Sequence, residues 1–230
     1  NNFYASYFAG ALLLPRQKLI DELNLFLAKE NPKPQEMVQL MTQFNVSPES
    51  FYQRLTNILP KDFNLKNLFF LRLSHKIGAD TYQIKKELHI TNQQEPHANE
   101  MNEHYCRRWV SIKTIEQLLQ QGKTHFFDAQ VSRYENSSNE YLVFSSATPD
   151  PFKKDCLRSI SVGILITPSV KKKFKFLEGD MVPRQLVGVT CETCAVKDCQ
   201  ERASEPIHLN QKIRNENTEA IVQKYMAKFS

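Results

Sequence analysis

The segment LRSISVGILIT, residues 157–167, carries the strongest β-strand signal in the chain. It is dense in isoleucine, leucine and valine, which is typical of a strand buried on both faces of a sheet. We therefore expect this strand to lie at the centre of a sheet, with the rest of the fold built around it.

Most segments on either side of residues 157–167 predict further strands of this sheet. Residues 111–122, SIKTIEQLLQQG, predict a short helix instead, with Ser111 as its N-cap and Gly122 as its stop. The basic segment after the central strand, residues 171–180, alternates only in part. The remaining strands are expected at residues 67–74, 80–90, 123–134 and 139–148.

The N-terminal part predicts helices. Residues 3–30 place apolar side chains at helical spacing, and Pro15 divides them into two helices. Residues 35–59 have the form of a helix-turn-helix, with Ser47 as the N-cap of the second helix. A helix that reads DNA needs several basic or amide side chains, and this one has only Arg54 as a base. A packed helical unit is therefore favoured over DNA binding.

A final amphipathic helix is expected at residues 216–229. The predicted fold class is α+β, with a helical N-terminal part, a central antiparallel sheet, a cysteine-rich loop and a C-terminal helix. The expected divisions are residues 1–60 for the helices, 61–187 for the sheet, and 188–230 for the cysteine-rich segment with the last helix.

The composition is that of a globular protein, with 41% hydrophobic and 24% charged residues. The net charge of +5 permits an anionic partner without requiring one. No apolar run approaches the roughly 18 residues of a membrane span, and an odd number of cysteines fits a reducing compartment. We expect a cytoplasmic protein without a membrane partner. Because the chain opens on Asn1, we also expect it to be a fragment of a longer protein.

Three of the five cysteines fall within GVTCETCAVKDCQERA, residues 188–203. The spacing Cys191-x2-Cys194-x4-Cys199 places three thiols on one short loop, where backbone amides can turn toward the sulfurs. A closed thiolate site takes four ligands, and the spacing does not separate zinc from an iron–sulfur cluster. Three unrelated reduced thiols are the alternative to both.

The fourth ligand is expected from outside this loop. Cys106 stands beside Arg107 and Arg108, whose positive charge favours a thiolate. Cys156 stands at the entrance to the central strand, where a lone cysteine is usually a small buried hydrophobe. His104 is a substitute for a sulfur ligand, although an exposed loop histidine is the simpler interpretation. We therefore choose Cys106.

The chain has no GxSxG, no HExxH and no glycine-rich phosphate loop, so we expect it not to be an enzyme. Basic residues of the strands are candidates for an anion site. The basic run at residues 171–175 is better explained as a solvated strand face, whereas Arg72 and Arg158 sit in or beside apolar strands.

Five segments occur in the order YFAGALLLPR, FNVSPESFYQRLTNI, FFLRLS, EPHANEMNEHYCRRW and GVTCETCAVKDCQERA. Over about residues 7–203 they resemble the regulatory region of the short-chain fatty-acyl regulators, bacterial helix-turn-helix transcription factors. The resemblance implies an effector-binding domain for short-chain acyl-coenzyme A, with a sheet similar to the PAS and GAF sensor folds. Its propionate-regulator branch implies a four-iron, four-sulfur cluster on Cys106, Cys191, Cys194 and Cys199. DNA binding would come from an upstream domain absent from this chain.

A pocket for acyl-coenzyme A should pair cations with apolar and aromatic walls. The candidates chosen from chemistry are Arg72, Arg107, Arg108, Arg158, Tyr82 and Phe144.

Two other functions stay open. One is a four-cysteine structural zinc domain that binds DNA or protein. The other is a degenerate zinc-metallopeptidase-like enzyme, because the pattern FAxxLLxP at residues 8–15 resembles the tail of such a fold. In that fold a glutamate metal ligand stands a few residues earlier, whereas residues 1–4 hold no carboxylate. The C-terminal helix is a candidate element of a homodimer, although packing on its own domain is the simpler expectation.

Overall fold

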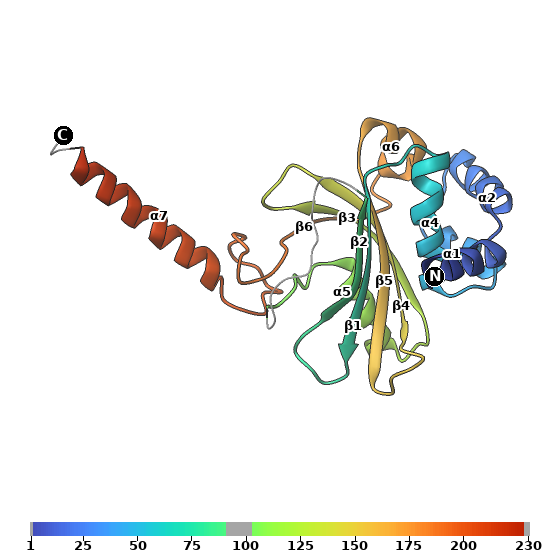
Figure 1. Ribbon diagram of the computed structural model, residues 1–230, viewed down its shortest axis with the longest axis horizontal. Helices are drawn as coiled ribbons and strands as arrows, with labels where there is room; N and C mark the ends of the chain where they lie inside the picture. Colours follow the sequence, from blue (N-terminus) through green and yellow to red (C-terminus); the bar gives the residue numbers. More distant parts are fainter. Residues whose placement is uncertain (1, 91–102, 228–230) are drawn as a thin grey trace.

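The computed structural model describes residues 2–90 and 103–227. In that part of the chain six strands form one sheet in the order β2-β1-β5-β4-β3-β6 (Figure 1). Neighbouring strands are antiparallel except β3 and β6, which are parallel. The strands are β1 (Leu68–Lys76), β2 (Gln83–Ile90), β3 (Phe126–Tyr134), β4 (Glu140–Pro149), β5 (Cys156–Leu165) and β6 (Arg184–Val187).

The segment with the strongest strand signal forms β5, which lies inside the sheet between β1 and β4. Its register with β1 places Gly163 opposite Phe69. A Cβ atom at Gly163 would lie 2.2 Å from ring carbons of Phe69. Glycine is therefore required where the aromatic ring of β1 crosses the central strand.

Helices from the N-terminal part cover one face of the sheet (Figure 1). Their apolar side chains pack against alternate residues of the strands, such as Phe70 and Phe144. Ser47 is the N-cap of α4, as predicted, because its hydroxyl oxygen accepts a hydrogen bond of 3.2 Å from the backbone N–H of Ser50. These helices are α1 (Asn2–Leu13), α2 (Arg16–Ala28), α3 (Glu36–Gln43) and α4 (Pro48–Asp62). The helix α6 (Pro168–Lys173) and the 3-10 turn η1 (Lys175–Leu177), which follow β5 in the sequence, pack into the same core.

The opposite face is covered by α5 (Val110–Gln121), which packs on the other set of alternate strand residues, including Phe69 and Tyr141. Gly122 ends this helix with φ of 59°, as predicted. The predicted N-cap is wrong. Trp109 occupies the cap position with extended backbone, and Ser111 lies buried inside the first turn.

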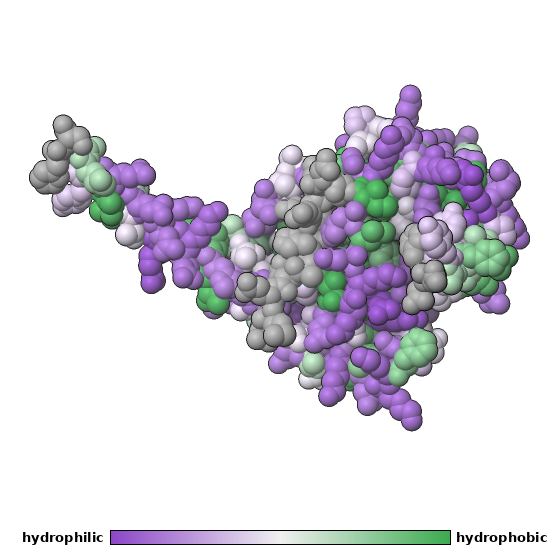
Figure 2. Space-filling view, in the orientation of Figure 1, coloured by the Kyte–Doolittle hydropathy of each residue, from purple (hydrophilic) through white to green (hydrophobic). Residues whose placement is uncertain are grey.

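The C-terminal helix α7 (Ile207–Met226) begins earlier than residue 216, where the apolar periodicity placed its start. It extends away from the sheet (Figure 1), and none of residues 207–226, all of which the structure describes, is buried. Figure 2 shows α7 as mostly hydrophilic, with hydrophobic residues near its two ends. Apolar periodicity marks a helix that packs on a core, so it did not predict the bounds of the exposed helix α7.

The α+β fold class is confirmed, with helices at the N-terminus, a mostly antiparallel sheet and a C-terminal helix. The partly alternating basic segment at residues 171–180 is not a strand, since α6 and η1 occupy it. Within the described residues, no helix combines the length and apolarity needed to cross a membrane.

Candidate functional site

The cysteine-rich loop is paired with the chain around Cys106, although more than 80 residues separate them. Tyr105 and Thr190 form an antiparallel bridge. The backbone N–H of Cys106 donates to the carbonyl of Val189 at 3.0 Å, and that of Cys191 donates to the carbonyl of His104 at 2.8 Å. The parallel strand β6 leads directly into this pairing, so the sheet fixes where the loop begins.

Gly188 lies between two of the four thiols. Its backbone N–H donates to Sγ of Cys106 at 3.4 Å, and a Cβ placed on it would lie 2.8 Å from Sγ of Cys194. Trp109 holds the same residue from α5, because its Nε1–H donates to the carbonyl of Gly188 at 2.9 Å. Both sulfurs thus contact a glycine whose position is fixed from two sides.

The structure brings together all four cysteines chosen from the sequence. They line a single cavity of about 10 Å³ beneath the loop, together with Arg107, Thr190, Glu201 and Arg202. Cys156 lies elsewhere, at the start of β5 opposite Lys76. The four thiols that line this cavity are therefore separate from the fifth, that of Cys156.

Backbone and side-chain donors order the loop. The N–H of Ala203 donates to Sγ of Cys191 at 3.3 Å. The guanidinium of Arg202 donates to the carbonyls of Cys191, at 3.1 Å, and Cys194, at 3.4 Å. Burial raises the pKa of the Cys106 thiol to about 11 and also raises that of Cys194.

His104 does not face the thiols as a substitute ligand. Its Nδ1 lies 2.7 Å from Oε1 of Glu192, and its backbone N–H donates to Oε2 at 3.0 Å. Burial opposes ionisation of Glu192, but these hydrogen bonds outweigh it and hold its pKa below the usual value. The histidine and the carboxylate together fasten the two paired segments.

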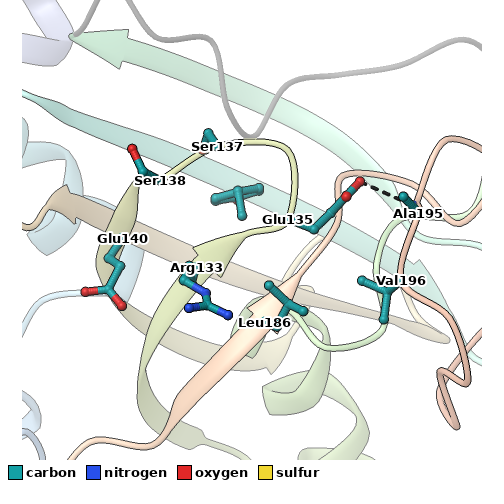
Figure 3. A pocket seen from close by; sticks show the side chains of 9 residues that line it. Arg133, Glu135, Ser137, Ser138, Glu140, Leu186, Ala195 and Val196 are labelled. Atoms are coloured by element: carbon teal, nitrogen blue, oxygen red, sulfur yellow. Dashed lines mark hydrogen bonds between the residues drawn. The ribbon is translucent and has the colours of Figure 1, made fainter.

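An open cavity of about 600 Å³ lies beside the thiol loop, at the turn between β3 and β4 (Figure 3). Its acidic groups already have partners. Glu135 Oε1 accepts a hydrogen bond of 3.3 Å from the backbone N–H of Ala195, and Glu140 pairs with Arg184 at 3.2 Å. This cavity therefore joins the turn to the thiol loop, and its carboxylates are already paired, while the exposed Arg133 also lines it.

The candidates for an effector pocket do not converge. Arg72 and Arg158, on neighbouring strands, both donate to Glu49 of α4, at 3.1 and 3.2 Å. Arg107 stacks over the ring of Tyr82, 4.6 Å from its centroid, at the other face of the sheet.

The other two candidates lie apart from these and from each other. Arg108 donates to the carbonyl of Leu186 at 3.4 Å, and Phe144 packs among the aromatic rings under η1. The six candidates are thus divided among four separate contacts, because charge and apolarity along the chain do not reveal which partner a folded side chain meets.

A groove of about 420 Å³ lies between α1, α4 and the outer strand β2. Arg54 of α4 lies in its wall and is only 5% exposed. Its Nε donates to the carbonyl of Leu14 at 3.1 Å, and its guanidinium lies 5.5 Å from the ring centroid of Tyr7. The lining residues are Tyr7, Ala9, Gly10, Leu13, Ser50, Gln53, Arg54, Thr56, Asn57, Phe70, Lys86, Glu87 and Leu88.

The helices of this groove are the part of the chain that matches a known family. Residues 2–56 match the IrrE N-terminal-like domain of the Peptidase_M78 family. The match runs from the start of α1 into α4, and so includes most of the helical wall of the groove. No curated protein matches the chain, and no solved structure matches it.

The IrrE-like match overturns the resemblance to the short-chain fatty-acyl regulators. The expectation of an acyl-coenzyme A sensor in a transcription regulator is therefore wrong, because the matched family is a different one. The match agrees better with the peptidase-like alternative. The DNA-binding domain upstream, the homodimer and the likeness to PAS and GAF sheets stay predictions.

The expected iron–sulfur regulator is also wrong, because residues 2–56 match a different family, and a cluster on the four thiols stays a prediction. The thiol cavity has room for about one water-sized sphere, whereas a cluster adds four irons and four sulfides. As the side chains stand, no three histidine, cysteine, aspartate or glutamate residues in ranges 2–90 and 103–227 are arranged to bind a metal ion.

The groove was not predicted from the sequence, although α1 carries a signal for it. This helix is apolar on all sides, and Phe8, Leu12 and Leu13 are more than half exposed. A helix apolar all round is normally buried. Exposed apolar side chains on such a helix indicate a surface that meets a ligand or another part of the protein.

Proposed function

We propose that the groove between α1, α4 and β2 binds an extended peptide in the cytoplasm, and that this chain supplies the recognition wall of a peptidase-like unit. The observation that supports this is the position of the groove. It lies where the helices matched to the IrrE-like domain meet the outer strand of the sheet. Its volume of about 420 Å³ lies within the range of ligand pockets.

The edge of β2 supplies the main-chain partner for such a peptide. Within the described residues, β2 pairs with β1 on one side and has no strand on the other. Residues 85–88 are exposed, and three of them line the groove. A peptide added as a strand would hydrogen-bond to this edge and place alternate side chains against α1 and α4.

We propose binding without hydrolysis by this chain. A zinc site that activates water uses three protein ligands, usually histidines and a carboxylate. The described lining of the groove contains one carboxylate, Glu87, and no histidine. Recognition of the peptide is therefore the part of a peptidase-like function that these residues support.

The proposal is tested by filling the groove. Gly10 lines it, and a Cβ at this position meets no atom within 4 Å. The substitution Gly10→Phe should weaken binding of a fluorescein-labelled hexapeptide of alternating threonine and valine at least ten-fold, measured by fluorescence anisotropy. The matched control Gly10→Ala adds one methyl group and should retain binding.

Amide hydrogen exchange locates the peptide. Binding should slow exchange at the backbone amides of β2 and leave that of α7 unchanged. A chain that does not bind the hexapeptide, or that binds it with no change in amide exchange at β2, would refute the proposed function.

A second proposal concerns the thiol loop. We propose that Cys106, Cys191, Cys194 and Cys199 hold one zinc ion as a structural staple. The support is that these thiols alone among the five cysteines line a common cavity, sized for a single small ion or water molecule. Because no three such side chains in the described residues are arranged as a metal site, zinc binding requires the cysteine side chains to move.

Zinc binding is tested by metal analysis of protein prepared with zinc and then dialysed. We expect one zinc per chain in the wild type and in Cys156→Ser, and none in Cys194→Ser. Zinc should also raise the melting temperature of the first two proteins but not of the third. Equal zinc content in all three would refute the staple.

A further inference from the structure

Arg54 is a buried cation without a carboxylate of its own. In the described part of the chain it forms no ion pair, and its only hydrogen bond runs from Nε to the carbonyl of Leu14. Asp62 interacts with it only at longer range, because that carboxylate is bonded to Arg16. An arginine that is only 5% exposed and has no anionic partner costs free energy, so its position in the wall of a groove requires an explanation.

Apolar surface and a second cation lie beside this guanidinium. Leu13, Phe70 and Leu88 line the same groove. Lys86 also lines it, with Nζ 5.7 Å from the ring centroid of Phe70. The groove therefore offers two cations beside apolar side chains, which complements an anion attached to an apolar group.

We infer that the groove recognises the free C-terminal carboxylate of a peptide that ends in an apolar residue. This inference rests on the peptide binding proposed above and names the ligand class of the same groove. Arg54 binds the carboxylate through its two Nη atoms, and Lys86 adds positive charge at the mouth. The terminal side chain packs against Leu13 and Leu88, the exposed apolar side chains of the groove.

A chain terminus fits this arrangement better than an aspartate or glutamate side chain. In a terminal apolar residue, the carboxylate and the apolar side chain leave the same α-carbon. They can therefore reach Arg54 and the apolar side chains of the groove together. An acidic residue inside a peptide supplies the charge but leaves these apolar side chains uncovered.

The test uses three fluorescein-labelled hexapeptides of the same alternating threonine and valine sequence and the full chain. The first ends in leucine with a free carboxylate, the second ends in leucine carboxamide, and the third ends in glutamate carboxamide. We expect the free acid to bind at least ten-fold more tightly than either amide, with β2 protected from amide exchange in each complex.

Two variants assign the carboxylate contact. Arg54→Met should reduce the preference for the free acid to less than three-fold, because it removes the cation and keeps much of the apolar stem. Lys86→Met changes an exposed residue of β2 and should reduce the preference by a smaller factor. Melting temperatures of both variants show whether they are folded.

The outcomes separate this inference from the proposed function. If none of the peptides binds, peptide binding itself is refuted. If the acid and the two amides bind equally at β2, peptide binding stands and carboxylate recognition is overturned. If glutamate carboxamide equals the free acid, or if both variants keep the full preference, the assignment of a terminal carboxylate to these cations is wrong.

Discussion

Gly188 leaves open the space that the thiol of Cys194 occupies, since a Cβ on this glycine would lie 2.8 Å from Sγ. The substitution Gly188→Ala should therefore displace Cys194 and lower the free energy of unfolding by about 1–3 kcal/mol, the usual cost of overpacking. It should also speed the reaction of Cys194 with a disulfide reagent, followed by absorbance and peptide mapping.

Gly179→Ala is the matched control for this prediction. Gly179 is exposed, and a Cβ on it meets no atom within 4 Å. The control should leave stability and thiol labelling unchanged. Slow labelling of Cys194 in the Gly188 variant would contradict the packing described for the loop.

Gly163 makes a comparable prediction for the sheet. In Gly163→Ala the new methyl group would lie 2.2 Å from ring carbons of Phe69, both on interior strands. Neither β1 nor β5 can move without disturbing its other neighbour. We expect a loss of about 1–3 kcal/mol in urea denaturation with little change in the m-value. The double variant with Phe69→Leu should recover part of this loss, and its failure to do so would contradict the contact.

Local signals in the sequence predicted the features that short segments determine. The central strand was predicted by its aliphatic content, the start of α4 by Ser47, and the end of α5 by Gly122. Each of these depends on side chains or backbone angles within a few residues.

Features that depend on pairing between distant segments were predicted less well. Arg72 and Arg158 were expected to bind an anion, and both instead reach Glu49, which belongs to a helix predicted separately. Arg54 was considered only as a contact to DNA, because its burial requires α1 to cross α4. The thiol loop is the exception, since its own spacing indicated a fourth partner and a positive neighbourhood indicated Cys106.

Glu49 connects α4 to β1 and β5 through ion pairs with Arg72 and Arg158. Replacing Glu49 should therefore affect both arginines. In Glu49→Gln the side chain keeps its shape but loses its charge, which leaves Arg72 and Arg158 without an anionic partner. Arg158 has a side chain only 13% exposed, so we expect a loss of about 1–3 kcal/mol in the free energy of unfolding. Urea denaturation at neutral pH measures it.

Glu216→Gln is the control for the Glu49 variant. Glu216 pairs with Lys212 at 3.9 Å on the exposed helix α7, where both side chains are more than half exposed. Exposed pairs of this kind contribute below about 0.5 kcal/mol. Equal effects of the two substitutions would show that Glu49 does not fasten the helix to the sheet.

His125, just before β3, makes stability depend on pH. Its Nε2 is buried without a hydrogen-bond partner in the described part of the chain, and burial lowers the pKa of the imidazole. The unfolded chain therefore takes up a proton as the pH falls below about 6.5, while the folded protein does not until a lower pH. The free energy of unfolding should fall across this window. Urea denaturation at pH 7.5 and 5.5 should show a smaller fall in His125→Gln, whose side chain stays neutral. An equal fall in both proteins would mean that other groups set the pH dependence.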